Sequence, residues 1–235
     1  MRLILIFVVL FSVSSCGLRH KEQKKHTTDS FNSVLEKHDL KGTILLYDVD
    51  KKTFYSNDFA QAEKGFLPAS TFKIANTIIA LETKVMDNDS SLLLWDGKKR
   101  DFKEWEKNLT LREAFQASCV PCFQYIAQKI GVKRMNAYLE KINYPPMVVN
   151  DSTLTDFWLR GPSRITAFQQ IAFLEKLKTK KLPIADKTYE EILRIMVIEQ
   201  TTSHALYGKT GWSYQESNNN GWFVGFIDKH NKTLL

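Results

Sequence analysis

The sequence predicts an α+β fold in which strands from both ends of the chain form one antiparallel sheet covered by helices. Short strand patterns occur after the N-terminal segment and again near the C-terminus, and the region between them is mainly helical in its periodicity. Of the 235 residues, 43% are hydrophobic, which is enough to bury one full core. We therefore expect a single domain over residues 30–235.

The N-terminal segment has the pattern of a secretory signal. Arg2 supplies a positive charge, residues 3–13 form an apolar run too short to span a bilayer, and two serines follow. We expect residues 1–15 to be the signal peptide. Residues 13–16 also resemble a bacterial lipobox, in which Cys16 carries lipid after cleavage, and an ordinary signal with an incidental cysteine is the alternative. Both predict a periplasmic protein, anchored to a bacterial membrane if Cys16 is lipidated.

Residues 17–29 are polar and lack apolar periodicity, which predicts a flexible tether before the domain. The net charge is +7, but lysine and arginine are scattered among acidic residues. A nucleic-acid-binding surface would gather them on one side, so we do not expect a nucleic-acid partner. Monomer and homodimer both remain open.

Local signals then place the elements in order. A short amphipathic helix begins at Ser30 and ends near Gly42, residues 43–49 and 53–56 form a hairpin, and a buried helix begins near Ser70. Further helix signals are capping boxes at Thr110 with Glu113 and Thr166 with Gln169, Pro121 in a first turn, Gly131 as a stop, and amphipathic residues 187–198. Residues 205–210, 221–228 and 232–235 have strand patterns.

Cys119 and Cys122 have the spacing of a Cys-x-x-Cys redox motif. A thioredoxin-type motif should follow a strand and open a helix in a βαβ unit, whereas these cysteines have helical surroundings on both sides. We therefore do not expect a redox catalyst. A structural disulfide and a pair of small buried thiols both remain open.

Ser70 and Lys73 are spaced so that both side chains lie on one face where a helix begins. A serine hydroxyl needs a base to become a nucleophile, and a lysine amine can act as one when burial lowers its pKa. The apolar residues that follow make such burial plausible. A helix cap beside a surface lysine would give the same letters, but no other Ser-x-x-Lys occurs in the chain.

Lys209, Thr210 and Gly211 form a second signal on a strand near the far end. A cation and a hydroxyl beside a glycine, where a ligand can approach the backbone, suit a substrate that carries a carboxylate. This triplet accompanies Ser-x-x-Lys in penicillin-recognising enzymes. An exposed edge lysine followed by a turn is the structural alternative.

Four ordered motifs resemble those of the class D β-lactamases, over about residues 42–228. They are Pro68-Ala69-Ser70-Thr71-Phe72-Lys73, Ser118-Cys119-Val120, Phe157-Trp158-Leu159 and Lys209-Thr210-Gly211-Trp212. The resemblance implies hydrolysis of β-lactam antibiotics such as penicillins through an acyl-enzyme on Ser70. It also implies that carbon dioxide converts Lys73 to N6-carboxylysine, the general base, with no other cofactor and no metal.

The resemblance implies a role for each remaining motif residue. Trp158 would donate a hydrogen bond to the carbamate and Val120 would shield it, while Ser118 would relay a proton to the leaving nitrogen. Lys209 and Thr210 would hold the substrate carboxylate. The backbone N–H groups of Ser70 and Trp212, beside Gly211, would form the oxyanion hole.

The sequence departs from the family in two places. Tyr144-Pro145-Pro146 stands where the family has Tyr-Gly-Asn, and proline removes both flexibility and an N–H. The chain also stops at Leu235, before the family's last strand, its carboxylate-binding arginine and its C-terminal helix. We therefore expect a domain that lacks most of a strand at one edge of its sheet.

Three other functions remain open beside hydrolysis. A penicillin sensor domain would be acylated and stay acylated, a cell-wall transpeptidase would hydrolyse penicillin poorly, and a truncated remnant would be inactive. The five histidines show no paired metal-ligand spacing, and no Gly-x-Ser-x-Gly elbow occurs. A metal-dependent hydrolase is therefore not expected.

Overall fold

The computed structural model describes residues 23–213, 219–230 and 232–235. The expected signal peptide, Cys16 and the first part of the expected tether lie outside these residues. Within the described ranges, no helix has both the length and the apolar character needed to cross a bilayer.

One sheet joins both ends of the chain, which confirms the predicted α+β class. Its seven strands have the order β1-β3-β2-β9-β8-β7-β6, and every neighbouring pair is antiparallel except β1 and β3. The strands are β1 (Lys24–Thr27), β2 (Leu45–Asp48), β3 (Thr53–Ser56), β6 (Val197–Gln200), β7 (His204–Ser213), β8 (Asn220–Lys229) and β9 (Lys232–Leu234). A separate small sheet pairs β4 (Leu92–Leu93) with β5 (Leu109–Thr110).

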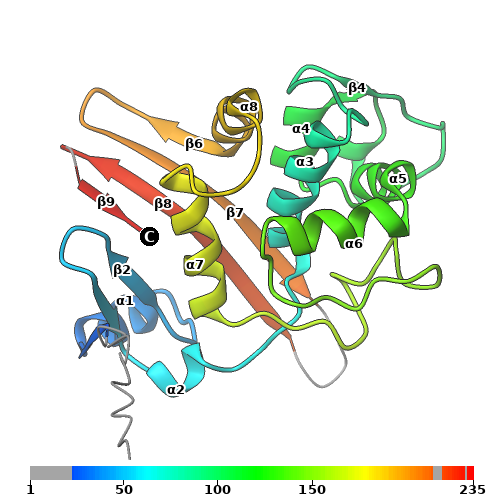
Figure 1. Ribbon diagram of the computed structural model, residues 1–235. Helices are drawn as coiled ribbons and strands as arrows, with labels where there is room; N and C mark the ends of the chain where they lie inside the picture. The colour runs from blue at the N-terminus through cyan, green and yellow to red at the C-terminus, as the bar shows by residue number, and fades with distance from the viewer. Residues whose placement is uncertain (1–22, 214–218, 231) are drawn as a thin grey trace, which may run out of the picture.

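The middle of the chain is helical, as predicted. In Figure 1, α7 lies across the sheet, and α3, α4, α5 and α6 form a group beside β7. The helices are α1 (Ser30–Lys37), α2 (Phe59–Ala62), α3 (Lys73–Glu82), α4 (Leu111–Gln116), α5 (Val120–Ile130), α6 (Val132–Lys141), α7 (Ala167–Lys178) and α8 (Asp186–Met196), with 3-10 turns η1 (Ala69–Phe72) and η2 (Lys103–Trp105).

Helix α3 is the centre of the core. Every residue from Lys73 to Leu81 is buried, because α5, α6 and α8 pack around this helix and leave no solvent-facing side. Both predicted capping boxes are present, at the starts of α4 and α7, and Gly131 ends α5 with φ 78°. The central helix therefore brings a lysine into a dry interior.

Two sequence expectations were wrong at the sheet. Residues 24–27, part of the expected tether, form β1 at the edge of the sheet. The strand is exposed and therefore has no apolar pattern. It is held by its pairing with β3 and by an ion pair in which Lys25 Nζ lies 2.9 Å from Glu63 Oε1. Strand β9 was expected at an edge but lies inside the sheet, between β8 and β2. The edge strands are β1 and β6.

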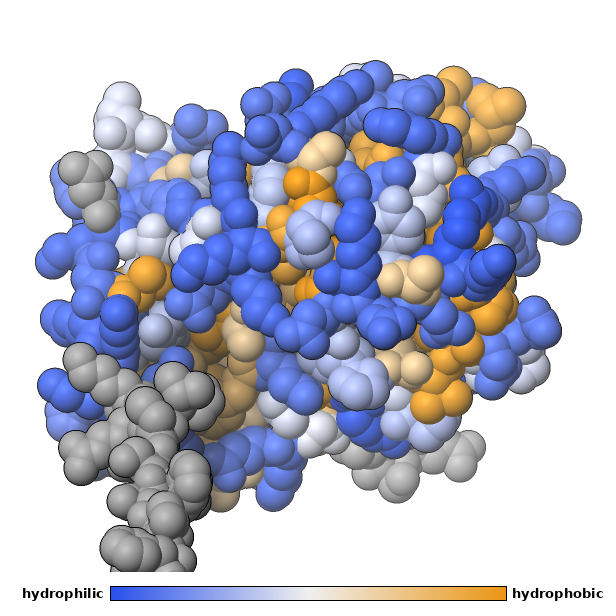
Figure 2. Space-filling model, viewed as in Figure 1, coloured by the Kyte–Doolittle hydropathy of each residue, from blue (hydrophilic) through white to orange (hydrophobic). Residues whose placement is uncertain are grey.

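Strand β9 is short for an internal strand. It pairs with three residues of β8 and, on its other side, with β2 through Asp48 and Leu234. Beyond it, an apolar groove of about 820 Å³ separates β2 from β8, with α7 as a further wall. Figure 2 shows apolar groups recessed among hydrophilic ones on this face, including the hollow between β2 and α7.

Candidate active site

The Ser70 side chain accepts a hydrogen bond from Lys73. Lys73 Nζ lies 2.7 Å from Ser70 Oγ, and both residues are buried. The turn η1 carries the serine directly into α3, which carries the lysine. Ala69, just before Ser70, has a left-handed φ of 49°, and its N–H donates to the Trp158 carbonyl at 2.8 Å. This bond holds the start of η1 in an otherwise unfavourable conformation.

Burial changes the chemistry of Lys73. The residue is fully buried, and this desolvation, together with the nearby charge of Lys209, holds the pKa of the Lys73 amine well below its usual range. Its ammonium form would also lie 5.3 Å from the centre of the Phe123 ring. A neutral amine can accept a proton from Ser70, and it can also react with carbon dioxide.

One half of the β7 edge faces η1 instead of a strand. β6 pairs with β7 only along residues 205–207, so residues 208–213 extend past it and pack against η1. At Gly211 the two backbones are so close that a Cβ atom would lie 3.0 Å from Thr71 Cγ2 and 3.2 Å from Ser70 N. Gly211 lets the η1 backbone at Ser70 approach β7 this closely, which a residue with a side chain would prevent.

Lys209 lies on this same part of β7. It is buried, and desolvation lowers the pKa of its amine to about 8. Its Nζ donates to the Thr210 carbonyl at 3.0 Å and lies 5.7 Å from the Phe115 ring of α4. A partly desolvated cation at the mouth of the site is suited to a substrate carboxylate.

Ser118 and Val120 lie at the junction of α4 and α5. Ser118 has a left-handed φ of 54°, and Val120 begins α5 after Cys119, its N-cap. Phe123 of the same helix contacts Lys73, and its carbonyl accepts from Asn76 Nδ2 of α3 at 3.4 Å. The junction is therefore packed against the helix that carries the lysine.

Trp158 is fully buried beside this helix start. Its ring stacks on Phe72 with centroids 5.5 Å apart, and in the described part of the chain its indole Nε1 has no hydrogen-bond partner. An unpaired buried donor is costly, on the order of 1–3 kcal/mol. Such an atom marks a position where an acceptor is expected to bind.

Two residues of the site were missed by sequence analysis. Gln170 of α7 is buried and donates from Nε2 to Thr71 Oγ1 at 2.8 Å, which ties η1 to α7. Phe123 provides the ring beside Lys73. Gln170 follows a capping box and Phe123 lies on an amphipathic helix, so neither carries a local signal of function. Tyr144, by contrast, packs edge-on against Phe72 with centroids 5.6 Å apart, despite the two prolines that follow it.

A buried serine–lysine pair at a helix start, opposed by a Lys-Thr-Gly strand edge, defines a penicillin-recognising serine enzyme. Residues 39–235 match the family model for the penicillin binding protein transpeptidase domain. β-Lactamase OXA-10 of Pseudomonas aeruginosa is 36% identical over 97% of this chain and 86% of its own length, and OXA-48 of Klebsiella pneumoniae is 31% identical with the same coverage.

Solved structures agree with these relatives. The class D β-lactamase YbXI from Nostoc superposes with a TM-score of 0.83 at 40% identity, covering 85% of this chain and 84% of that one. FUS-1 (OXA-85) from Fusobacterium nucleatum subsp. polymorphum has a TM-score of 0.84 at 32% identity, covering 89% and 87%. The chain belongs to the class D β-lactamases.

Proposed function

We propose that this protein hydrolyses β-lactams through an acyl-enzyme on Ser70, with Lys73 in its carboxylated form as the general base. The observation that carries the proposal is the 2.7 Å contact between Lys73 Nζ and Ser70 Oγ in a buried site. Family membership supports the reaction, and the β-lactamases OXA-10 and OXA-48 are named for it.

The residues present fit the two halves of such a reaction. The Ser70 hydroxyl loses its proton to the Lys73 side chain and attacks the lactam carbonyl, while the Ser70 and Trp212 N–H groups hold the oxyanion. Ser118 gives its proton to the nitrogen as the C–N bond breaks and takes one back from the Lys73 side chain, which is then a free base again. A water molecule loses a proton to this base and attacks the ester, and the base passes that proton to Ser70 as the C–O bond breaks.

Two features support carboxylation of Lys73. The amine is desolvated and its pKa is lowered, so it has the free electron pair that carbon dioxide needs. The Trp158 indole supplies a buried N–H with no partner among the described residues, which suits an added carboxylate. Carboxylation would supply an anionic oxygen base that works in both halves of the reaction.

A nitrocefin assay of the full chain tests this function. We expect turnover that falls when bicarbonate is removed and recovers when it is added. The Trp158→Phe variant keeps an aromatic ring, although a smaller one, but loses the N–H, so it should need about tenfold more bicarbonate. Trp95→Phe, which removes an indole donor to the Lys98 carbonyl, should behave as the wild type.

The assay also separates the alternatives. A stable acyl-enzyme without turnover would assign a non-hydrolytic penicillin-binding domain, of the sensor or the transpeptidase type. A folded protein that nitrocefin does not acylate would be an inactive remnant. Turnover that is indifferent to bicarbonate would refute the carboxylated lysine and leave the serine chemistry intact.

Lys209 predicts a pH dependence. Its amine is cationic below a pKa of about 8 and becomes neutral above it, whereas the substrate carboxylate stays anionic. We therefore expect kcat/KM for penicillins to fall about tenfold as the pH rises through this value, because a charge-assisted bond is lost. Lys209→Arg keeps its charge and should move the fall to higher pH. A wild-type profile that does not fall would contradict this role of Lys209.

We infer further that the protein is exported to the periplasm. Cys119 and Cys122 form a disulfide, a bond that persists in oxidising compartments. The signal-like residues 1–15 support the same location, and Cys16 is the residue that would carry a lipid anchor.

A further inference from the structure

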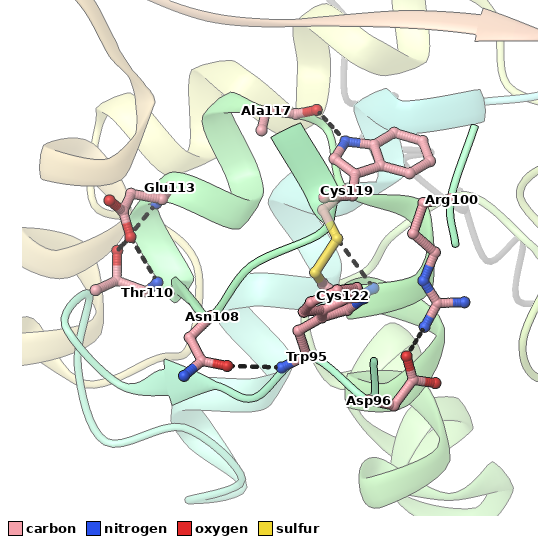
Figure 3. Close-up of a disulfide and its surroundings, with 10 residues drawn as sticks. Trp95, Asp96, Arg100, Asn108, Thr110, Glu113, Ala117, Cys119 and Cys122 are labelled. Carbon is pink, nitrogen blue, oxygen red and sulfur yellow. Dashed lines mark hydrogen bonds and ion pairs between the residues drawn. A yellow bond between two sulfur atoms is a disulfide. The ribbon is translucent and has the colours of Figure 1, made fainter. Parts of the chain in front are cut away.

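The disulfide lies within one of the site motifs. Cys119 stands between Ser118 and Val120, and Val120 lies inside the small loop that the bond to Cys122 closes. Figure 3 shows the bond at the start of α5, with Trp95 and Arg100 of the preceding loop near it. The cross-link is therefore covalently adjacent to two residues that the proposed reaction uses.

The chain on the Ser118 side of the bond is held by hydrogen bonds. The Cys119 N–H donates to the Ala114 carbonyl at 2.9 Å, and Trp105 Nε1 donates to the Ala117 carbonyl at 2.9 Å. These contacts fix the end of α4 but do not reach the Ser118 side chain. Ser118 has φ 54° because it ends α4 in the left-handed conformation common at helix C-termini, with its N–H donating to the Phe115 carbonyl at 3.1 Å.

The chain on the other side of the bond is held against Lys73. Cys122 precedes Phe123, whose ring lies 5.3 Å from Lys73 Nζ and whose carbonyl accepts from Asn76. The Cys119 sulfur also accepts from the Cys122 N–H at 3.3 Å, so it caps α5. The disulfide thus joins a segment fixed to α4 with a segment fixed to α3.

We propose that the Cys119–Cys122 disulfide is a positioning element for the reaction, and that its reduction slows turnover. The bond ties the Ser118 end of α4 to the start of α5, which carries Val120, the residue expected to shield the base, and Phe123, whose ring lies 5.3 Å from Lys73 Nζ. This proposal rests on the proposed function, because the effect is transmitted through Ser118 and the carboxylated Lys73. A freed α5 start would admit water to the carbamate and move the Ser118 hydroxyl.

The two sulfurs differ in access. Cys119 is fully buried, whereas Cys122 is only half-buried, so a thiolate can reach the Cys122 sulfur first. A dithiol such as dithiothreitol would attack Cys122 and release Cys119, and its second thiol would then displace Cys122. Two electrons pass from the dithiol, which closes to its cyclic disulfide, and two protons end on the cysteine sulfurs.

The test compares the oxidised and reduced full-length protein. We expect reduction to lower kcat about tenfold, since small misplacements at a reacting centre have effects of this order or larger. It should also raise the bicarbonate concentration needed for half-maximal activity and weaken the carbamate signal in ¹³C NMR. Reoxidation should restore all three. Thermal unfolding and thiol alkylation with mass spectrometry report the folded fraction and the redox state.

Cys122→Ser is the matched variant, because it removes the cross-link but keeps the Cys119 cap. It should resemble the reduced enzyme and show no further response to dithiothreitol, and it serves as the test if the native bond resists reduction. The proposal is overturned if the untreated protein has free thiols at both positions. It is also overturned if the reduced enzyme or the variant keeps its kcat and bicarbonate requirement, or loses activity only in proportion to unfolding. Failure of the proposed function would differ, since the oxidised protein itself would then not turn over nitrocefin.

Discussion

Replacement of Lys73 with alanine is expected to lower nitrocefin turnover by about 10³-fold, the range for loss of a general base. The reason is geometric, since Lys73 Nζ is 2.7 Å from Ser70 Oγ and donates a hydrogen bond to that oxygen. Both acylation and deacylation should slow. Pre-steady-state kinetics and mass spectrometry of the acyl-enzyme will measure the two steps separately.

The variant should remain folded, which makes the result interpretable. Lys73 is fully buried and its charged form is strongly disfavoured there, so its removal takes away a desolvated group as well as packing. Thermal unfolding provides the check. Lys99→Ala, at an exposed lysine, is the matched control and should retain wild-type kinetics. Wild-type turnover by Lys73→Ala would remove this lysine from the mechanism.

Gly211→Ala is expected to lower kcat/KM by about 10²-fold, as for loss of an oxyanion-hole donor. The added methyl group would lie 3.0 Å from Thr71 Cγ2 and 3.1 Å from Thr71 N, closer than ordinary contact. Either β7 or η1 must shift, which changes the distance between the Ser70 N–H and the Trp212 N–H, the two proposed donors of the oxyanion hole. Steady-state kinetics with several penicillins will measure the effect.

Gly221→Ala is the control for this substitution. Gly221 is the cross-strand partner of Trp212 on β8, and a Cβ atom there would meet nothing within 4 Å. It introduces the same change of residue into the adjacent strand without touching η1. If both alanine variants lose activity equally, the cause is a general disturbance of the sheet and the argument from the Ser70 contact fails.

The elements that sequence analysis located were those with strong local signals. The capping boxes at Thr110 and Thr166, the turn between β2 and β3, and the stop at Gly131 depend on residues close together in the chain. The four motifs could also be read in order along the sequence, since each consists of neighbouring residues. Their assembly around Lys73 is a property of the fold.

The features that sequence analysis missed depend on contacts between distant segments. β1 is polar and exposed, so only its pairing with β3 identifies it as a strand. The place of β9 inside the sheet depends on β2, which lies far away in sequence. Gln170 and Phe123 reach the site from α7 and α5, and neither residue type signals such a role. The sequence also left open whether Cys119 and Cys122 form a disulfide or two thiols, because that choice depends on how close the two sulfur atoms lie in the fold.

One edge of β7 pairs with β6 along residues 205–207 and packs against η1 beyond them. Where β6 stops, the backbone of residues 208–213 has no strand on that side, and most proteins protect such an edge because it can pair with other chains. Here η1 occupies that edge and holds the Ser70 backbone against Gly211. A longer β6 would complete the sheet but would need the place that η1 takes, so a change that stabilises the sheet here would cost the position of Ser70.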